Sequence, residues 1–190
     1  RYTVPPDILL ITADALRADH ISSYGYPRKT SPNIDNFAKE GVTFLNCFAT
    51  GPATIFASVG LLTGKYLSTN KHEPFWDNVL DRKFTTLAEY LKGFGYCTIA
   101  FLANGTYRGN RGFEQGFDDF FIYREIDAGR LSVNVLNLFN KPNRQRPLFV
   151  WVHFLEPHSP YLFRENYFKL FESDELYKNN GKILEVKPEN

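Results

Sequence analysis

The stretch Asp7-Ile-Leu-Leu-Ile-Thr-Ala-Asp14 is short, almost continuously apolar and ends in a carboxylate. Such a run is typical of a strand buried on both faces of a parallel sheet. Similar apolar runs predict further strands at 42–49, 96–103 and 147–155. The chain therefore has the strands of a sheet, and what separates them decides the fold class.

Helical signals lie between these runs. Small apolar residues at 54–63, followed by Gly64, predict one helix, and 128–139 predicts another. Thr86 and Glu89 have the spacing of a capping box, which predicts a helix that ends at Gly93 or Gly95. Strands that alternate with helices predict an α/β fold with three layers (α/β/α) and a mostly parallel central sheet.

The sequence also predicts a helix from Ser31 to Gly41, with Pro32 in its first turn. Ile34, Phe37 and Ala38 form its expected buried stripe. The Gly-rich aromatic stretch 111–118 has no periodicity and is expected to be an ordered loop. We expect residues 1–161 to form the main domain and 162–190 to form a surface helix and loop.

Composition excludes some classes of function. The 190 residues carry a net charge of +1, so no basic stripe favours a nucleic-acid partner. No apolar run approaches the roughly 20 residues that span a bilayer. Cys47 and Cys97 are too few for a disulfide framework, and both lie in apolar runs. Buried free thiols, and with them a cytoplasmic location, are the expectation.

Polar residues follow several of the predicted strands, or lie near their ends: Asp14, Thr54, Asn104 and His158. In open parallel sheets, ligands bind beyond the carboxyl ends of the strands. The sequence therefore predicts that these residues share one site.

The position of each residue suggests a role and an alternative. Asp14 is a candidate ligand for a hard cation, or else a helix cap or a partner for Arg17. Thr54 opens a helix, where its hydroxyl meets free N–H groups and can become a nucleophile near a metal, although threonine is also a common N-cap.

The four histidines are expected to differ in location and role. His158 lies between two prolines in Glu156-Pro-His-Ser-Pro160, where a stiff loop suits a ligand or general acid. His153 lies inside an apolar strand and is interpreted as a core residue. His20 and His72 are expected at the surface.

Several segments resemble sulfatase-like proteins of the alkaline phosphatase superfamily. They occur in order between Asp7 and Tyr161: Leu9-Leu-Ile-Thr-Ala-Asp-Ala-Leu-Arg-Ala-Asp-His20, Phe37-Ala-Lys-Glu-Gly-Val-Thr-Phe44, Leu61-Leu-Thr-Gly-Lys-Tyr66 and His153-Phe-Leu-Glu-Pro-His-Ser-Pro-Tyr161. The resemblance implies an alkaline phosphatase-like fold that contains a divalent metal (Mn, Zn, Ca or Mg). It implies a small-molecule substrate, or a glycan or lipid ester.

The resemblance also implies roles for single residues. Asp14 falls on a metal carboxylate, and Thr54 falls on the nucleophile, which also binds the metal. His158 falls on the histidine that meets the transferred group or the leaving group. Asn104 lies in a loop that approaches the substrate in some relatives.

The sequence departs from the sulfatase pattern at the nucleophile. Sulfatases oxidise a Cys or Ser to formylglycine within Cys/Ser-x-Pro-x-Arg, whereas this chain has Thr54-Ile-Phe-Ala-Ser58. Threonine cannot give that aldehyde, because its β-carbon carries a methyl group. Thr54 is instead similar to the nucleophile of the superfamily's phosphodiesterases, phosphonate hydrolases and phosphoglycerol or phosphoethanolamine transferases. The expected function is a metal-dependent hydrolase or transferase of phosphate-type esters, with sulfate esters as a further option; the alternative is a catalytically inactive binding domain.

A second departure is the lack of the family's Asp-His-Gly motif after His158. That motif normally completes the metal site. The sequence begins with Arg1 and contains no Met, which indicates an incomplete gene product. Because members of the resembled family are longer, we expect the chain to be the N-terminal part of a catalytic domain and inactive by itself; the alternative is a protein that has lost its activity.

Overall fold

The computed structural model describes residues 5–66, 80–109, 111–124, 126–142, 144–161 and 163–171. By its internal contacts, the chain divides into two units, Arg1–His158 and Ser159–Asn190. The first unit contains the sheet and every candidate site residue named above.

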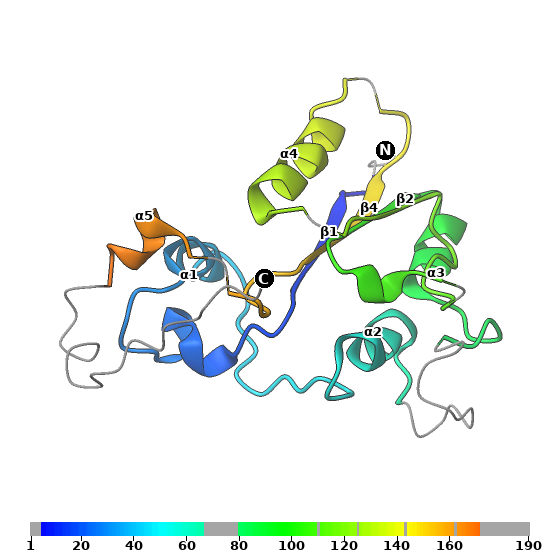
Figure 1. Cartoon of the computed structure of the whole chain (residues 1–190). Coiled ribbons are helices and arrows are strands. Elements are labelled where there is room, and N and C mark those ends of the chain that lie inside the picture. The colour runs from blue at the N-terminus through cyan, green and yellow to red at the C-terminus, as the bar shows by residue number, and fades with distance from the viewer. Residues whose placement is uncertain are drawn as a thin grey trace. The chain divides into compact units, whose positions relative to one another are not determined.

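A four-stranded parallel sheet forms the centre of the first unit (Figure 1). Its order is β1-β4-β2-β3, with all neighbours parallel. The strands are β1 (Ile8–Ala13), β4 (Leu148–Phe154), β2 (Cys97–Leu102) and β3 (Asp119–Ile122). The three strands predicted at 7–13, 96–103 and 147–155 are confirmed.

The register of the sheet brings the ends of three strands together. His153 of β4 pairs with Thr12 of β1 on one side and with Leu102 of β2 on the other. Hydrogen bonds continue one step past the strands, from Asp14 N to Phe154 O (2.9 Å) and from Ala103 N to His153 O (2.9 Å). The residues that follow β1 and β2 therefore leave the sheet at the same edge.

Helices cover both faces of the sheet. On one face, α2 (Thr54–Thr63) and α3 (Leu87–Gly93) pack through Val59, Leu62 and Ala88 on buried side chains of β2 and β4. On the other face, α4 (Ala128–Phe139) packs Leu131 and Val135 on a second apolar cluster. These two cores make the predicted three-layer α/β/α fold.

The local signals that bound these helices act as expected. Thr86 accepts a hydrogen bond from Glu89 N, and the Glu89 side chain accepts one from Thr86 N, which completes the capping box of α3. Gly64, after α2, adopts the left-handed conformation (φ 67°) in which glycine is favoured over other residues. The start of α3 and the end of α2 are thus set by the sequence near them.

The region between β1 and α2 differs from the prediction. Residues 42–49 form no strand; Val42, Phe44 and Phe48 lie 69–84% exposed. The apolar run that predicted a strand has no partner strand among the described residues, and a lone strand is not stable. Cys47 is accordingly an exposed free thiol, not a buried one, whereas Cys97 is half-buried.

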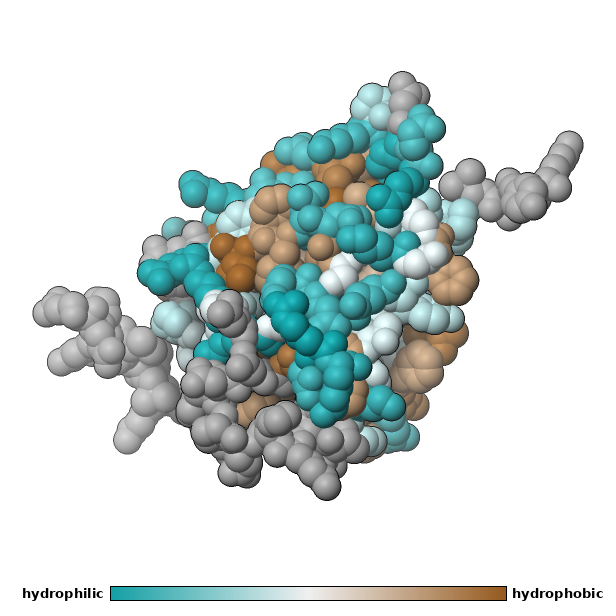
Figure 2. Space-filling model, turned by 90° about the vertical axis from the view of Figure 1, so that its right-hand side faces the viewer, coloured by the Kyte–Doolittle hydropathy of each residue, from teal (hydrophilic) through white to brown (hydrophobic). Residues whose placement is uncertain are grey.

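The helix after Ser31 is also shorter and more exposed than predicted. It is α1 (Pro32–Ala38), and it contains no buried residue. Ile34 is 48% and Phe37 80% exposed, so the expected buried stripe is wrong. Exposed aromatic residues occur elsewhere too, such as Tyr90 of α3. In the view of Figure 2, hydrophobic residues form patches among hydrophilic ones.

Short elements complete the described structure. These are three 3₁₀ turns, η1 (Ala18–His20), η2 (Ser22–Tyr24) and η4 (Gly105–Tyr107), and in the second unit the helix α5 (Glu165–Phe168). His20 is exposed, as expected, while His72 and most of the segment 162–190 lie outside the described residues. In the part of the chain that the structure describes, no helix has the length and apolar character to cross a membrane.

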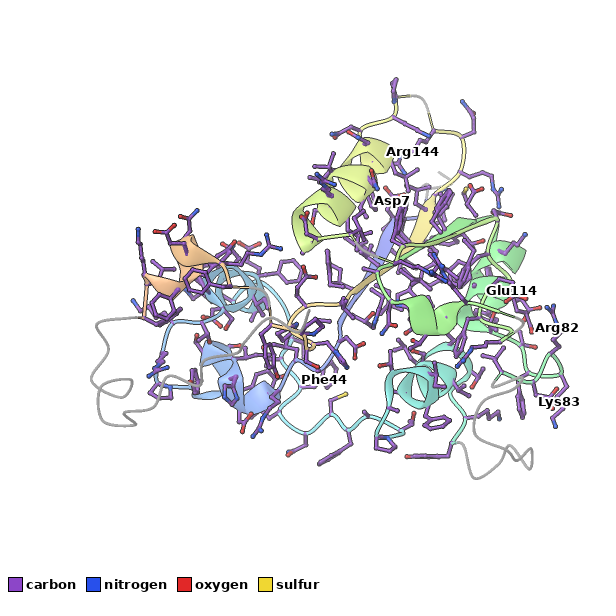
Figure 3. All side chains as sticks on the ribbon, viewed as in Figure 1. Asp7, Phe44, Arg82, Lys83, Glu114 and Arg144 are labelled. Atoms are coloured by element: carbon purple, nitrogen blue, oxygen red, sulfur yellow. The ribbon has the colours of Figure 1, made fainter. Side chains whose placement is uncertain are left out.

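The amino ends of β1 and β4 are joined by an ion pair. Arg144 donates two hydrogen bonds to Asp7 (2.9 and 2.7 Å), and Leu148 N donates a third (2.8 Å). Figure 3 shows the two labelled side chains close together. The hydrogen bonds from Arg144 hold the pKa of Asp7 below its usual range, despite an opposing effect of partial burial.

We predict that Asp7→Asn lowers the free energy of unfolding at neutral pH by about 1 kcal/mol, because it removes a two-pronged, partly buried ion pair. Since folding lowers the pKa of Asp7, its stabilisation is present above the carboxyl's unfolded pKa and is lost as pH falls through the folded one. Urea unfolding between pH 2 and 7 measures this.

Glu114→Gln is the control for that measurement. It removes the salt bridge between Glu114 and Arg82, whose side chains are 42% and 71% exposed (Figure 3), and it should leave stability nearly unchanged. Equal effects of the two variants, or an Asp7→Asn variant as stable as the wild type at pH 7, would contradict the prediction.

Candidate functional site

Asp14 is the first residue after β1, and its side chain is the centre of the candidate site. It is 8% exposed, and its own N–H is bonded to Phe154 O of β4. The next residue, Ala15, has φ 57°, a left-handed conformation that is uncommon for residues other than glycine. The chain therefore turns sharply at the end of β1 and leaves Asp14 at the edge of the sheet.

Thr54 is the first contact of Asp14. Its hydroxyl Oγ1 lies 3.0 Å from Asp14 Oδ1 and 3.1 Å from Oδ2, and it donates to the carboxylate. The N-cap of α2 is Ala53, and no side-chain cap bond is made there. The alternative that Thr54 serves as an N-cap is therefore not observed; its half-buried hydroxyl faces the carboxylate.

Asn104 is the second contact. Its amide Nδ2 donates to Asp14 Oδ2 at 2.7 Å, while its Oδ1 accepts from the N–H and the hydroxyl of Thr106 at 2.9 and 2.8 Å. Asn104 is also the N-cap of η4 and is only 8% exposed. The amide nitrogen of Asn104 is therefore engaged with Asp14.

His153 is the third contact, and sequence reasoning did not place it in the site. It is 4% exposed, its Nδ1 lies 2.8 Å from Thr12 Oγ1, and its Nε2 lies 3.5 Å from Asp14 Oδ2. That Nε2 is buried without a hydrogen-bond partner among the described residues. His153 is thus buried in the core, with Nδ1 against Thr12 of the neighbouring strand and Nε2 facing Asp14 of the candidate site.

The side chain of His158 differs from these contacts in being exposed. His158 follows β4 by four residues, in a turn where its N–H donates to Leu155 O (2.9 Å). The hydrogen bonds of the Asp14 carboxylate come from Thr54 and Asn104 instead. Arg17, the other partner considered for Asp14, pairs with Asp19.

The environment keeps Asp14 ionised. Burial by itself raises the pKa of this carboxyl, but His153, Thr54 and Asn104 together lower it more, so its pKa lies below the usual range. A carboxylate that is mostly buried and still charged can attract a cation. The edge of the sheet therefore carries a fixed negative charge beside a hydroxyl.

Asp14 and Thr54 fit one side of a divalent-metal site. Both offer oxygen atoms, the ligand type that hard cations prefer, and they come from two separate elements, β1 and α2. Among the described residues, no group of three or more His, Cys, Asp and Glu side chains could hold a metal ion. The fit is therefore to part of a ligand set.

These features define a class of protein. A parallel sheet covered by helices on both faces, with a carboxylate and a helix-opening hydroxyl at its carboxyl edge, matches the alkaline phosphatase-like α/β fold. The chain belongs to the sulfatase family, whose model matches residues 6–183.

Curated relatives agree with this family. An N-acetylgalactosamine-6-O-sulfatase of Bacteroides thetaiotaomicron is 34% identical over 97 residues, which are 49% of this chain and 19% of that protein. Arylsulfatase A of Bos taurus is 36% identical over 99 residues, 50% of this chain and 20% of the relative. The matched part thus spans about a fifth of these relatives.

Solved structures share the fold. A phosphonate monoester hydrolase of Agrobacterium radiobacter has a TM-score of 0.72 at 22% identity, over 88% of this chain and 44% of that one. The C-terminal periplasmic domain of EcEptC from Escherichia coli, solved with zinc, has a TM-score of 0.66 at 22% identity, over 99% and 52%. Both confirm the alkaline phosphatase-like fold.

We predict that Asn104→Ala lowers the free energy of unfolding by about 1–3 kcal/mol, because a buried carboxylate loses a donor and η4 loses its cap. Thermal unfolding followed by circular dichroism measures the change.

Asn36→Ala is the matched control. It removes an exposed amide that accepts a hydrogen bond from Lys39 (2.9 Å), and its effect should stay within about 0.5 kcal/mol. An Asn104→Ala variant no less stable than Asn36→Ala would show that the hydrogen bond to Asp14 contributes nothing.

Proposed function

We propose that Thr54 is the nucleophile of a metal-dependent hydrolase or transferase that acts on phosphate-type esters. The observation that carries this proposal is the contact of Thr54 Oγ1 with both oxygens of the ionised Asp14, at 3.0 and 3.1 Å. The contact lies at the amino end of α2, where free N–H groups and the helix dipole favour an anionic group.

The proposed first step transfers the phosphoryl group to the protein. Thr54 Oγ1 attacks phosphorus, the new Oγ1–P bond forms, and the bond from phosphorus to the leaving oxygen breaks. The hydroxyl proton of Thr54 goes to solvent, because Asp14, with its lowered pKa, is a poor acceptor. His158 gives a proton to the leaving oxygen.

The second step frees Thr54. Water, in a hydrolase, or an alcohol, in a transferase, attacks the phosphorus and loses its proton to His158. The Oγ1–P bond breaks, and Thr54 regains a proton. Throughout both steps, Asn104 and His153 hold Asp14 in place from two sides, which keeps the carboxylate ionised and oriented toward Thr54.

Asp14 and Thr54 are the residues proposed to hold the divalent metal, Mn, Zn, Ca or Mg. A bound divalent cation lowers the pKa of a coordinated hydroxyl and offsets negative charge on a transferring group. Two structural neighbours support a chemistry of this kind, since one is a phosphonate monoester hydrolase and the other was solved with zinc.

The identity of the nucleophile favours phosphate over sulfate. Curated relatives are sulfatases, and a formylglycine at this position needs a Cys or Ser precursor, which Thr54 is not. A sulfate ester stays within the proposal only if Thr54 attacks sulfur directly. The proposed substrate class is a small-molecule ester, or a glycan or lipid ester. One structural neighbour was solved with its substrate, D-glucosamine-2-N,6-O-disulfate.

The test compares variants of the full-length protein, since the chain spans only part of its relatives. With a chromogenic phosphodiester, a phosphonate monoester and an aryl sulfate, Thr54→Ala should lose on the order of 10³-fold or more in kcat, because no hydroxyl is left to attack. Thr54→Ser keeps a hydroxyl and should retain measurable turnover.

Thr63→Val is the matched control, since it removes the hydroxyl at the far end of α2, where Thr63 donates to Val59 O (2.6 Å). It should leave kcat within about twofold of wild type. Turnover by Thr54→Ala equal to wild type would refute Thr54 as nucleophile. A wild-type protein that binds no divalent cation in calorimetry and turns over none of the three esters would favour the inactive binding domain.

A further inference from the structure

Tyr107 is a buried residue that the proposed chemistry leaves without a role. It ends η4, is 2% exposed, and its hydroxyl lies 2.7 Å from Ser58 Oγ in α2. Ser58 is itself 5% exposed and donates its hydroxyl hydrogen to the backbone carbonyl of Thr54 at 2.8 Å. The two buried hydroxyls therefore form a chain of hydrogen bonds that ends at the backbone carbonyl of Thr54, the proposed nucleophile.

The direction of this chain of hydrogen bonds is fixed. Ser58 has a single hydroxyl hydrogen, which goes to Thr54 O, so Tyr107 must donate to Ser58 Oγ. Burial raises the pKa of Tyr107 well above its usual range; the hydrogen bond with Ser58 opposes this shift in part, and the negative charge of Asp14 adds to it. Tyr107 therefore keeps its proton at physiological pH.

The contacts of Thr54 form a closed series that leaves from its side chain and returns to its backbone. The Thr54 side chain is bound to Asp14, Asp14 accepts from Asn104, and Asn104 caps the three-residue η4 that ends at Tyr107. Tyr107 returns to Thr54 through Ser58. Thr54 is thus held at two points, through its hydroxyl and through its carbonyl, and η4 links the two.

The ring of Tyr107 also contacts the third neighbour of Asp14. It packs edge-on against His153, with ring centroids 5.2 Å apart and planes at 80°, and against Trp151 at 5.3 Å and 85°. Trp151 Nε1 donates to Thr12 Oγ1, which in turn lies against His153 Nδ1. Tyr107 therefore packs against His153 through its ring and is linked to the first turn of α2 through its hydroxyl.

We propose that Tyr107 and Ser58 are positioning residues that hold Thr54 at the angle and distance needed for attack. This inference rests on the proposed function, in which Thr54 is the nucleophile. Its physical basis is that reacting groups tolerate little misplacement, since a shift of about 1 Å can cost roughly 100-fold in rate. Neither residue needs to touch the substrate.

Tyr107→Phe tests the proposal in the full-length protein with a chromogenic phosphodiester, because it removes one hydroxyl and keeps the ring. We expect kcat to fall by about 10-fold or more while KM stays within about twofold. Tyr96→Phe is the matched control: it removes another buried tyrosine hydroxyl, one that donates to Pro6 O at 3.1 Å, and should leave kcat unchanged.

Ser58→Ala breaks the chain of hydrogen bonds from its other end and keeps the test valid if Tyr107→Phe folds poorly. Its control is Ser132→Ala, which removes the same type of bond, from Ser132 to the carbonyl of the first residue of α4 (2.7 Å). We expect Ser58→Ala to match Tyr107→Phe in kcat, and the double variant to be no worse than either, since both remove one connected unit.

A second measurement does not depend on turnover. Hydrogen exchange at the first-turn amides of α2 should become faster in Tyr107→Phe and Ser58→Ala and stay unchanged in both controls. If Tyr107→Phe changed neither hydrogen exchange nor kcat, the positioning role would be overturned and the assignment of Thr54 as nucleophile would stand. Equal kcat losses in Tyr107→Phe and Tyr96→Phe would have the same meaning. Wild-type turnover by Thr54→Ala would overturn the nucleophile as well, so the two failures are distinguishable.

Discussion

The structure around the site depends on one charged group, the carboxylate of Asp14, which is buried and yet ionised. A buried charge is costly unless it is paired and hydrogen-bonded. Here the hydroxyl of Thr54 from α2, the amide of Asn104 before η4 and the ring of His153 in β4 surround it. Stabilising this one charge therefore fixes three elements at the carboxyl edge of the sheet, and those elements supply the groups proposed for chemistry.

Much of this arrangement could be predicted from the sequence, because the signals are local. The predicted strands at 7–13, 96–103 and 147–155 agree with the observed ones to within one residue at each end, since each is a short apolar run buried on both faces. The ends of α2 and α4 were predicted at the observed residues. Asp14 and Asn104 follow β1 and β2, which lie on either side of β4 and end at the same edge of the sheet, so the rule for parallel sheets was enough to place both at one site.

The predictions fail where contacts with distant parts of the chain, and not the local sequence, decide the structure. In the part of the chain that the structure describes, residues 42–49 have a strand-like pattern but no neighbouring strand. The sequence does not predict β3 (Asp119–Ile122), because it is only four residues long and follows a Gly-rich loop; it pairs with β2. His153 was assigned to the core from its apolar neighbours. Only the register, which places it beside Thr12, brings its Nε2 to Asp14.

The central claim is that Thr54 carries the transferred group, and a trapped intermediate tests it most directly. The full-length protein is mixed with a phosphodiester substrate, quenched in acid within milliseconds and digested, and the peptide that contains Thr54 is sequenced by mass spectrometry. The account predicts a phosphoryl group on Thr54 that still carries the diester's second ester substituent and that forms and decays with turnover. The same group on Ser58, or turnover with no modified peptide, would contradict it.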